Sequence, residues 1–437
     1  MWLHGIMSAV RSGFFRDNLL TFSARIAGVL FFAAFSAIVG RILGPEGKGV
    51  VSLSMMVVTY MTTIGTLGVD YGLIQLVGKR RDALRGGVAA LLWTCLISSA
   101  LLCALLWFLG PWRKFVGLGG LDNILWLLTI LAIPPALFSK AFQEIFRAKG
   151  NFIGFNAFDA GRSLLSALFA VLLVWAWPLG NLGAILSVPL REMVLIALGL
   201  VILWPALSLA PRRDPWKTVL SFGLKASLGN TLQFLNYRLD AFIVAYFLGT
   251  YGVGIYAAAV GLAEFLWFVP GSVALVLFPR AAALPEEEAK TLAASATRIT
   301  QFITFIGAIL MAALGWLAIW IIYGPQFSSS YLPLLLILPG IWLFGYGKLS
   351  VSYLMGMNKP LYGTYLTVFS LVLMVPLDLL MIPKWGVSGA SIASSIVYSL
   401  GGFLGIWWFI RHTRLPLSAF LLPRKEDWGF LRGAMRR

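Results

Sequence analysis

Charged residues are scarce in this chain of 437 residues, at 12% of the total, whereas soluble globular proteins carry roughly 25%. Hydrophobic residues make up 59%, and the mean hydropathy is +0.88. This composition argues against a soluble globular fold. The alternating pattern of a membrane β-barrel, repeated over segments of about ten residues, is also missing. The sequence therefore predicts an all-α polytopic membrane protein.

Histidine and cysteine are nearly absent, with two residues of each. His4 and His412 lie outside the apolar runs, so we expect neither a His/Cys metal site nor a buried histidine proton relay. Cys95 and Cys103 share one apolar run and are interpreted as packing residues, not as a disulfide.

Long connections and nucleotide-binding motifs are missing too. The Walker pattern G-x-x-x-x-G-K-[ST] does not occur, and the segments between apolar runs are short. No extramembrane domain is expected that could hold a nucleotide or a soluble active site. We therefore predict that the chain is not an enzyme and needs no cofactor.

Apolar runs separated by helix breakers predict twelve membrane-spanning helices. The predicted spans are 19–43, 50–78, 86–110, 124–146, 155–177, 182–204, 218–247, 253–278, 298–323, 331–353, 362–382 and 386–410. The first run begins at Leu19 and has no cleavage site, so we expect a membrane helix there, not a signal peptide. An even number of spans places both termini on one side.

Basic residues predict the orientation. Twenty-four of the 34 Lys and Arg residues fall in segments on the side of the N-terminus, and Lys348 is interpreted as one of them. By the positive-inside rule, both termini are then cytoplasmic. The same bias accounts for most of the net charge of +17, so no nucleic acid partner is expected.

Several residues recur at a nearly constant offset of 205 or 206 positions. They are Leu43, Gly44, Gly47 and Gly49 with Leu248, Gly249, Gly252 and Gly254, and Gly180, Gly183 and Ala184 with Gly386, Gly389 and Ala390. We therefore predict two six-helix lobes, an N-terminal lobe at 1–210 and a C-terminal lobe with a basic cytoplasmic tail at 211–437. Such parallel repeats typically enclose a central substrate site and rock against each other.

Ionisable residues also occur inside the predicted spans. A charge at the bilayer centre costs about 2.5–3.5 kcal/mol on insertion scales, so these residues are expected to face a polar interior or to pair. They are Arg25, Asp70, Asp159, Arg162, Arg191, Glu192, Lys225, Arg238, Asp240, Glu264 and Asp378.

Helical spacing gives these charges different expected partners. Asp159 and Arg162 are three residues apart and are expected to pair. Arg191 and Glu192 are adjacent, about 100° apart, and are expected to point in different directions. Asp378 lies near the outer end of its span, where we expect it to reach water.

Arg238 and Asp240 lie on nearly opposite faces of one helix, about 200° apart, so each needs its own partner. Arg238 either forms an interhelical salt bridge, with Glu264 or Asp70 as candidates, or lines a cavity for an anionic ligand. Arg25 either snorkels to the inner surface or lines that cavity. The carboxylates Asp70, Asp240 and Glu264 are candidates for coupling to H⁺ or Na⁺.

An unpaired arginine in such a cavity is suited to phosphate, and aromatic faces are suited to sugar rings. The candidate substrate-binding residues are Arg25, Arg238, Arg191, Asn236, Tyr237 and Gln233.

Three stretches resemble a known family. They are GRILGPEGKGVVSLS at Gly40–Ser54, GTLGVDYGLIQLVGK at Gly65–Lys79, and RLDAFIVAYFLG at Arg238–Gly249 followed by GVGIYAAA. The chain resembles the polysaccharide-transporter branch of the multidrug/oligosaccharidyl-lipid/polysaccharide (MOP) superfamily, whose members move O-antigen and exopolysaccharide units on undecaprenyl diphosphate. The resemblance covers nearly the whole chain.

The resemblance implies two six-helix lobes around a cationic cavity that opens alternately inward and outward. It implies a multi-pass protein of the bacterial inner membrane that serves lipopolysaccharide or exopolysaccharide biosynthesis, with a polymerase and export machinery as partners. Arg25 and Arg238 are then expected to contact the diphosphate of an undecaprenyl-diphosphate-linked oligosaccharide.

Three alternatives stay open at this point. A cation-coupled multidrug exporter of the same superfamily would have a carboxylate-dominated cavity, with Asp70 and Glu264 exposed and the arginines in salt bridges. A membrane glycan polymerase or ligase would normally need a long outer loop with carboxylates or a metal motif. A membrane scaffold without transport activity would leave the embedded charges unexplained.

Overall fold

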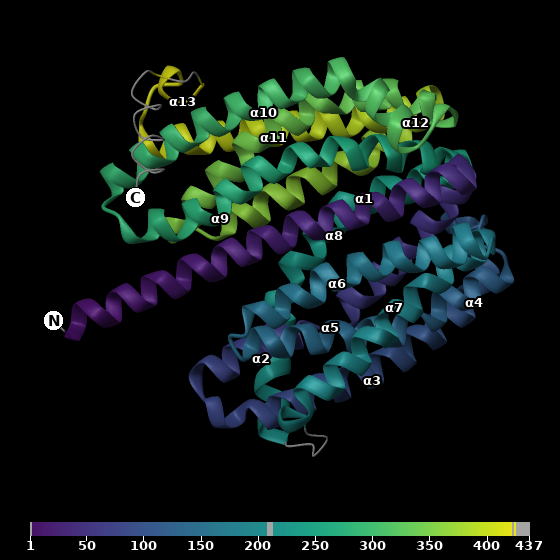
Figure 1. Ribbon diagram of the computed structural model, residues 1–437. Helices are drawn as coiled ribbons and strands as arrows, with labels where there is room; N and C mark the ends of the chain where they lie inside the picture. Colours follow the sequence, from purple (N-terminus) through teal and green to yellow (C-terminus); the bar gives the residue numbers. More distant parts are fainter. Residues whose placement is uncertain (1, 208–212, 422–423, 425–437) are drawn as a thin grey trace. The chain divides into compact units, whose positions relative to one another are not determined.

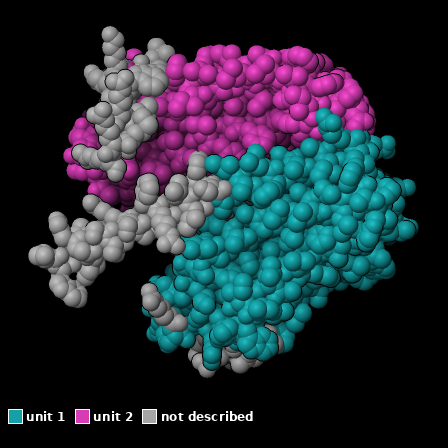
Figure 2. Space-filling model, viewed as in Figure 1, with its two compact units in different colours: residues 1–234 teal, residues 235–437 magenta. Residues whose placement is uncertain are grey.

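The computed structural model describes residues 2–207, 213–421 and 424, and within these ranges it leaves undescribed the side chains of residues 2–23, 25, 81, 213–215, 226, 228–230, 233 and 234. In these ranges the regular secondary structure is helical, without strands. The chain divides into two compact units, unit 1 with residues 1–234 and unit 2 with residues 235–437 (Figures 1 and 2).

Eight helices start in unit 1, and short helical turns connect them. They are α1 (Trp2–Gly65), α2 (Val69–Lys79), η1 (Arg81–Ala83), α3 (Leu84–Leu109), η2 (Gly110–Val116), α4 (Asn123–Leu131), α5 (Ile133–Ala148), α6 (Phe152–Ala170), η3 (Val171–Ala176), α7 (Gly180–Leu203), η4 (Trp204–Ala206) and the start of α8 (Arg213–Ala263). Unit 2 contains the rest of α8, then η5 (Glu264–Trp267), α9 (Phe268–Ala283), α10 (Glu286–Ile322), η6 (Pro325–Ser330), α11 (Tyr331–Gly356), α12 (Leu361–Thr413) and α13 (Ser418–Leu421).

Nine helical segments of the described chain are long and apolar enough to cross a membrane. Three of them, Ile26–Gly65, Leu235–Ala283 and Leu361–Thr413, contain a break between two of the predicted spans. The predicted all-α polytopic membrane fold is confirmed. The number of twelve spans, the cytoplasmic location of both termini and the lobe boundaries at 210 and 211 stay predictions.

The breaks lie at glycines with a left-handed backbone, with φ of 70° at Gly44, 66° at Gly249 and 59° at Gly386. Gly180, the first residue of α7, has φ of 62°. Glycine adopts this region readily, whereas other L-residues lose about 1–2 kcal/mol there. Gly44 matches Gly249 and Gly180 matches Gly386 in the sequence repeat, so the paired glycines share a positive φ at corresponding positions.

Each unit has its own packed interior. In unit 1, α6 packs on α1, and α5 contacts both α7 and α3. In unit 2, α11 lies at the centre and packs on α12, α9 and α10. The arrangement places residues of α8, η5, α11 and α12 next to one another, which matters for the site described below.

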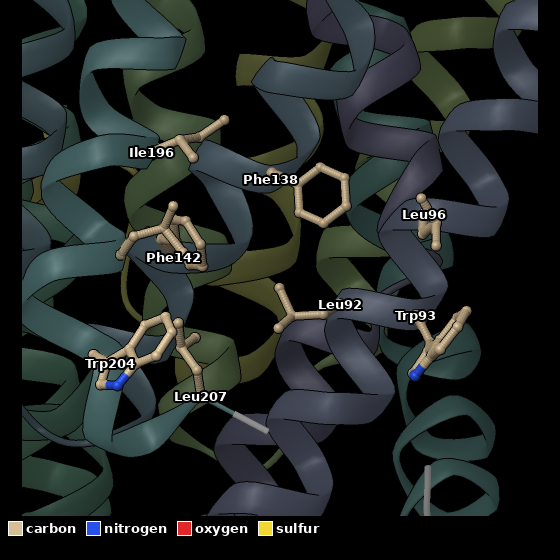
Figure 3. Close-up of a pocket in the computed structure, with 9 residues that line it drawn as sticks. Leu92, Trp93, Leu96, Phe138, Phe142, Ile196, Trp204 and Leu207 are labelled. Atoms are coloured by element: carbon tan, nitrogen blue, oxygen red, sulfur yellow. The ribbon is translucent and has the colours of Figure 1, made fainter. Parts of the chain in front are cut away.

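Unit 1 also has an apolar groove of about 710 Å³ (Figure 3). Its walls come from α3, α5 and α7, and its end comes from η4 and Leu207. All nine of its lining residues are apolar or aromatic. The groove thus offers a chain-like ligand an apolar surface and few polar partners.

The glycine breaks can be tested at Gly249, with Gly271 in α9 as the matched control. A methyl group at either position meets no atom within 4 Å, so only the backbone conformation differs. We expect Gly249→Ala to lower the free energy of unfolding by about 1–2 kcal/mol, because φ is positive there. Gly271→Ala should keep or raise stability, by up to about 1 kcal/mol, because it lies within a helix. Equal losses in both purified variants, measured by unfolding in detergent, would contradict this account.

Candidate functional site

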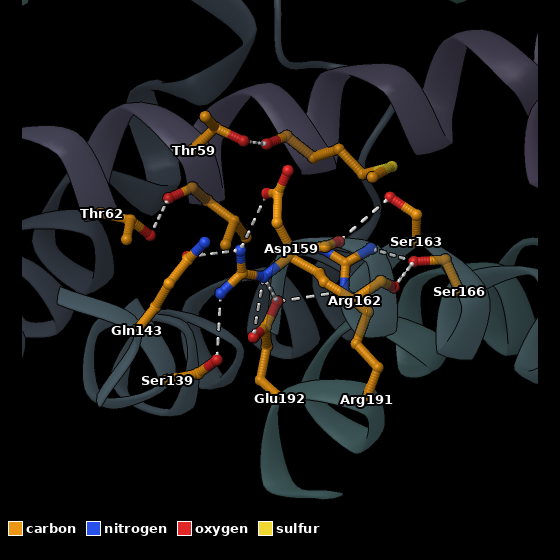
Figure 4. Close-up of polar contacts among 12 residues, drawn as sticks. Thr59, Thr62, Ser139, Gln143, Asp159, Arg162, Ser163, Ser166, Arg191 and Glu192 are labelled. Atoms are coloured by element: carbon orange, nitrogen blue, oxygen red, sulfur yellow. Dashed lines mark hydrogen bonds and ion pairs between the residues drawn. The ribbon is translucent and has the colours of Figure 1, made fainter. Parts of the chain in front are cut away.

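Two arginines of unit 1, Arg162 and Arg191, pair with the carboxylate of Glu192 in α7 (Figure 4). Its carboxylate is 3.1 Å from Arg162 Nε and 3.1 Å from Arg191 Nε, and Glu192 is 1% exposed. Arg162 also donates to Gln143 Oε1 at 3.0 Å and to Ser139 Oγ at 3.1 Å. The network joins α5, α6 and α7, so its charges tie the helices of unit 1 together.

Two expectations from spacing need correction here. Arg191 and Glu192 were expected to point in different directions, but they form an ion pair because the long arginine side chain bridges the angle between adjacent positions. The expected contact of Arg162 with Asp159 is present but long, at 3.9 Å, and Asp159 is 56% exposed. Glu192 is the closer acid for Arg162, so the network is mainly interhelical.

Arg191 is nearly buried, and its Nη1 donates to Ser166 Oγ at 2.5 Å. Both of these partners, Glu192 and Ser166, lie inside unit 1, so the guanidinium stabilises the packing of its helices. The role of Arg191 in binding substrate stays a prediction, and no contact of the side chain points to it.

In unit 2, Arg238 of α8 pairs with Glu264 of η5, with Nη2 3.1 Å from Oε2. This is the interhelical salt bridge that was one of the two alternatives for Arg238, so Arg238 is not a solitary cation. The two side chains remain 36% and 25% exposed, respectively. The α-helix tightens into a 3-10 turn at Glu264–Trp267, an irregularity that often marks functional positions.

Beside this pair, Lys348 of α11 contacts a cluster of aromatic rings. Its Nζ lies 3.8 Å from the ring centre of Trp267, 5.7 Å from that of Tyr237 and 5.6 Å from that of Phe344. Tyr398 of α12 completes the cluster, 5.2 Å from both Trp267 and Phe344. Within the described chain, no carboxylate forms an ion pair with Lys348.

We call Arg238, Glu264, Lys348 and the rings of Tyr237, Trp267, Phe344 and Tyr398 the cationic–aromatic site. Its two cations and one carboxylate leave one positive charge. A ring face attracts an ammonium group but leaves its N–H groups available for stronger acceptors. The site is therefore chemically suited to a ligand that carries both an anionic group and sugar rings.

Asp240 of α8 has its own partners, as expected from its position on the helix face opposite Arg238. It accepts hydrogen bonds from the backbone N–H of Ala241 at 2.7 Å and from Tyr256 Oη at 2.5 Å. Tyr256 Oη is in turn 3.1 Å from Ser394 Oγ on α12, which is 3.8 Å from Met374 Sδ. This chain of contacts leads from Asp240 to the turn of α12 that precedes Asp378.

Asp378 was expected to reach water, and that prediction is wrong. The residue is fully buried, at 0% exposed, and within the described structure neither of its carboxylate oxygens has a hydrogen-bond partner. The helix α12 continues past Asp378 to its break at Gly386, and the arm after the break packs back near this turn, with Ser394 Oγ 3.8 Å from Met374 Sδ. An ionised carboxylate in such surroundings is costly unless a proton or cation accompanies it.

Other predicted residues are dispersed or lie outside the description. The side chains of Arg25 and Gln233 are outside the described residues. Asn236 is buried in unit 2, and Asp70 is buried in unit 1. One side-chain oxygen of each has no partner within the described residues.

Lys348 is the residue that the sequence interpretation missed. It was assigned to the cytoplasmic side, but it lies within the apolar segment Pro325–Gly356. A better signal was available, because position 348 falls inside the predicted span 331–353. Trp267 was missed because it was one of 17 tryptophans, most of which were attributed to interfaces or packing.

A polytopic helical protein with charges held inside its membrane segments belongs to a class of membrane proteins in which such charges usually mark a functional path. A family model described as "Polysaccharide biosynthesis protein" matches residues 38–332. The chain therefore belongs to this family, and with it to the polysaccharide-transporter branch of the MOP superfamily.

One curated relative is an uncharacterized membrane protein, MJ1068, from Methanocaldococcus jannaschii. It is 24% identical over 196 residues, which cover 44% of this chain and 39% of that protein. The match thus spans only about two fifths of the relative's length.

Solved structures share the fold at low identity. A lipid II flippase, MurJ, superposes with a TM-score of 0.76 at 12% identity, over 93% of this chain and 89% of that one. An inward-facing multidrug resistance transporter of the MATE family gives 0.75 at 16% identity, over 88% and 94%. A MOP superfamily transporter from Pyrococcus furiosus gives 0.61 at 15% identity, over 91% and 94%. These likenesses establish the fold.

The unit 1 network can be tested at Glu192, with Asp159 as the matched control. Glu192→Gln leaves two guanidinium groups without their carboxylate, so we expect a loss of about 3–5 kcal/mol in the free energy of unfolding. Asp159→Asn removes a long and exposed contact and should cost less than about 1 kcal/mol. Denaturant unfolding of the purified variants measures both, and similar losses would mean that Glu192 does not organise the network.

Proposed function

We propose that this protein is a flippase that moves polyprenyl-diphosphate-linked oligosaccharide repeat units across the bacterial inner membrane by alternating access. Membership of a polysaccharide biosynthesis family and a fold like that of a lipid II flippase support this proposal. The observation that carries it is the cationic–aromatic site, where Lys348 lies over Trp267 beside the Arg238–Glu264 pair.

The chemistry of the site matches both parts of such a head group. A diphosphate accepts charge-assisted hydrogen bonds from Lys348 and Arg238, and these are stronger than neutral hydrogen bonds. The faces of Trp267 and Tyr237 suit sugar rings. The proposed partners are the lipid-linked oligosaccharide and the surrounding bilayer, together with the polymerase and export machinery that the family resemblance implies.

The exporter alternative finds less support in the same residues. It requires Asp70 and Glu264 to be exposed in a carboxylate-dominated cavity and the arginines to be held in salt bridges. The pairing of Arg238 with Glu264 meets the last requirement, but the exposure of the two carboxylates does not follow. Asp70 is 3% exposed, and Glu264 is neutralised by Arg238. The polymerase or ligase alternative has no feature in its favour among the described residues.

We further propose that H⁺ or Na⁺ coupling acts through Asp240 and Asp378. Asp240 was a coupling candidate from the sequence, and the contacts through Tyr256 and Ser394 link it to the helix turn before Asp378. A buried carboxylate without a donor can lower its free energy by holding a proton or a cation. Glu264 is a weaker candidate because its carboxylate already forms an ion pair with Arg238.

The substrate site can be tested in cells whose surface polysaccharide depends on this gene. Lys348→Gln removes the ammonium group, and we expect at least a tenfold loss of surface polysaccharide, because a hydrogen bond to a charged group contributes roughly 1.5–3 kcal/mol. Lys359→Gln, at an exposed position after the same helix, should leave export unchanged. Normal export by the Lys348 variant at equal protein level would remove this residue from the mechanism.

The coupling site can be tested in proteoliposomes with imposed pH or Na⁺ gradients. Asp378→Asn cannot release a proton or neutralise a cation, so we expect transport that no longer responds to either gradient. Glu288→Gln, which changes an exposed carboxylate in the first turn of α10, is the matched control and should respond like the unmodified protein. A gradient response that survives in the Asp378 variant would refute this assignment.

A further inference from the structure

The apolar groove of unit 1 shares no residue with the proposed substrate or coupling sites (Figure 3). Its floor contains Leu92 and Phe142, which are buried. Its rim contains Leu96, Leu200 and Trp204, which are exposed. Large apolar side chains that surround an open hollow in a membrane segment favour the chain of a lipid over a polar solute.

The groove lies toward one end of α3 and α7. Leu92 is eight residues after the start of α3, and Ile196 is seven residues before the end of α7, so each lies about 10–12 Å from its helix end. One leaflet of a hydrocarbon core of about 30 Å is roughly 15 Å deep. The lining residue Leu96 is twelve residues after the start of α3, or about 18 Å. The groove therefore extends to about the bilayer centre from the side that the basic residues predict to be cytoplasmic.

Arg85 lies at the end of the groove on the predicted cytoplasmic side. Arg85 Nη2 donates to the carbonyl oxygen of Pro205 at 3.2 Å, and Pro205 follows the lining residue Trp204. Arg85 is exposed, as are Lys79 and Arg80 nearby in the sequence, and Asp82 is the acidic residue of this segment. Arg85 thus provides an exposed guanidinium group at the mouth of the groove, whereas the walls of the groove are apolar.

We propose that this groove binds an anionic phospholipid of the inner leaflet, with an acyl chain against Leu92 and Phe142 and the phosphate at Arg85. Basic pockets between membrane helices on the cytoplasmic side attract anionic head groups, by about 1 kcal/mol for each Lys or Arg near the surface. An acyl chain fits the depth of one leaflet, whereas a long polyprenyl chain exceeds it. The inference does not depend on the proposed transport function.

Native mass spectrometry of the purified full-length protein tests the proposal, with phosphatidylglycerol and phosphatidylcholine added in equal amounts. We expect the unmodified protein to retain phosphatidylglycerol preferentially. Arg85→Gln should reduce that preference about fivefold, and Arg85→Lys should restore it, because charge is the recognised feature. Lys149→Gln changes another exposed cation of unit 1 and should have no effect.

The chain-binding part is tested by Leu200→Trp, which fills the groove and should abolish retention of either lipid. Leu198→Trp is the matched control, because Leu198 is 50% exposed on the same helix and does not line the groove. Equal retention of phosphatidylglycerol by the Leu200 variant and the unmodified protein would overturn the proposal. Displacement of phosphatidylglycerol by an equal amount of undecaprenyl phosphate would overturn it as well, because the groove would then prefer a polyprenyl chain.

Discussion

An ion inside a membrane needs a partner, and the two units of this protein meet that constraint in different ways. In unit 1, the carboxylate of Glu192 pairs with both Arg162 and Arg191. Side-chain oxygens of serine and glutamine accept hydrogen bonds from the remaining N–H groups of these arginines. This arrangement is closed and mostly buried. In unit 2, Lys348 is accompanied by an aromatic face, and Asp378 has no partner among the described side chains. Within the part of the chain that the structure describes, Lys348 and Asp378 thus lack the ion-pair partners that the paired charges of unit 1 have.

In our proposal, this difference separates charges that hold the helices together from charges that bind ligand or a coupling ion. Breaking a closed ion network leaves uncompensated charges, so the unit 1 residues are suited to holding helices together. A ring face binds a cation without occupying its N–H groups, so Lys348 can add an anionic ligand and keep its aromatic contact. Arg238 and Glu264 lie beside it as an accessible pair, which a diphosphate could share.

The polytopic helical fold could be predicted from the sequence because apolar runs and their breakers are local properties. The repeated glycines were equally informative, since the conformations at Gly44 and Gly249 depend on the residue itself and not on distant contacts. Partners of charged side chains were harder to predict. The angle between Arg191 and Glu192 on a helix ignores the reach of arginine, and the burial of Asp378 depends on tertiary packing that the position of a residue along its span does not show.

The central claim is that Lys348 of unit 2, which lies over the ring of Trp267, binds the diphosphate of a lipid-linked oligosaccharide. The most direct measurement follows a fluorescent polyprenyl-diphosphate oligosaccharide in proteoliposomes, where a membrane-impermeant quencher reports the label on the outer leaflet. Vesicles with the unmodified protein should expose more label over time than protein-free vesicles, and a neutral polyprenol-linked analogue without diphosphate should not respond. Exposure at the protein-free rate, or equal movement of the two lipids, would contradict the account.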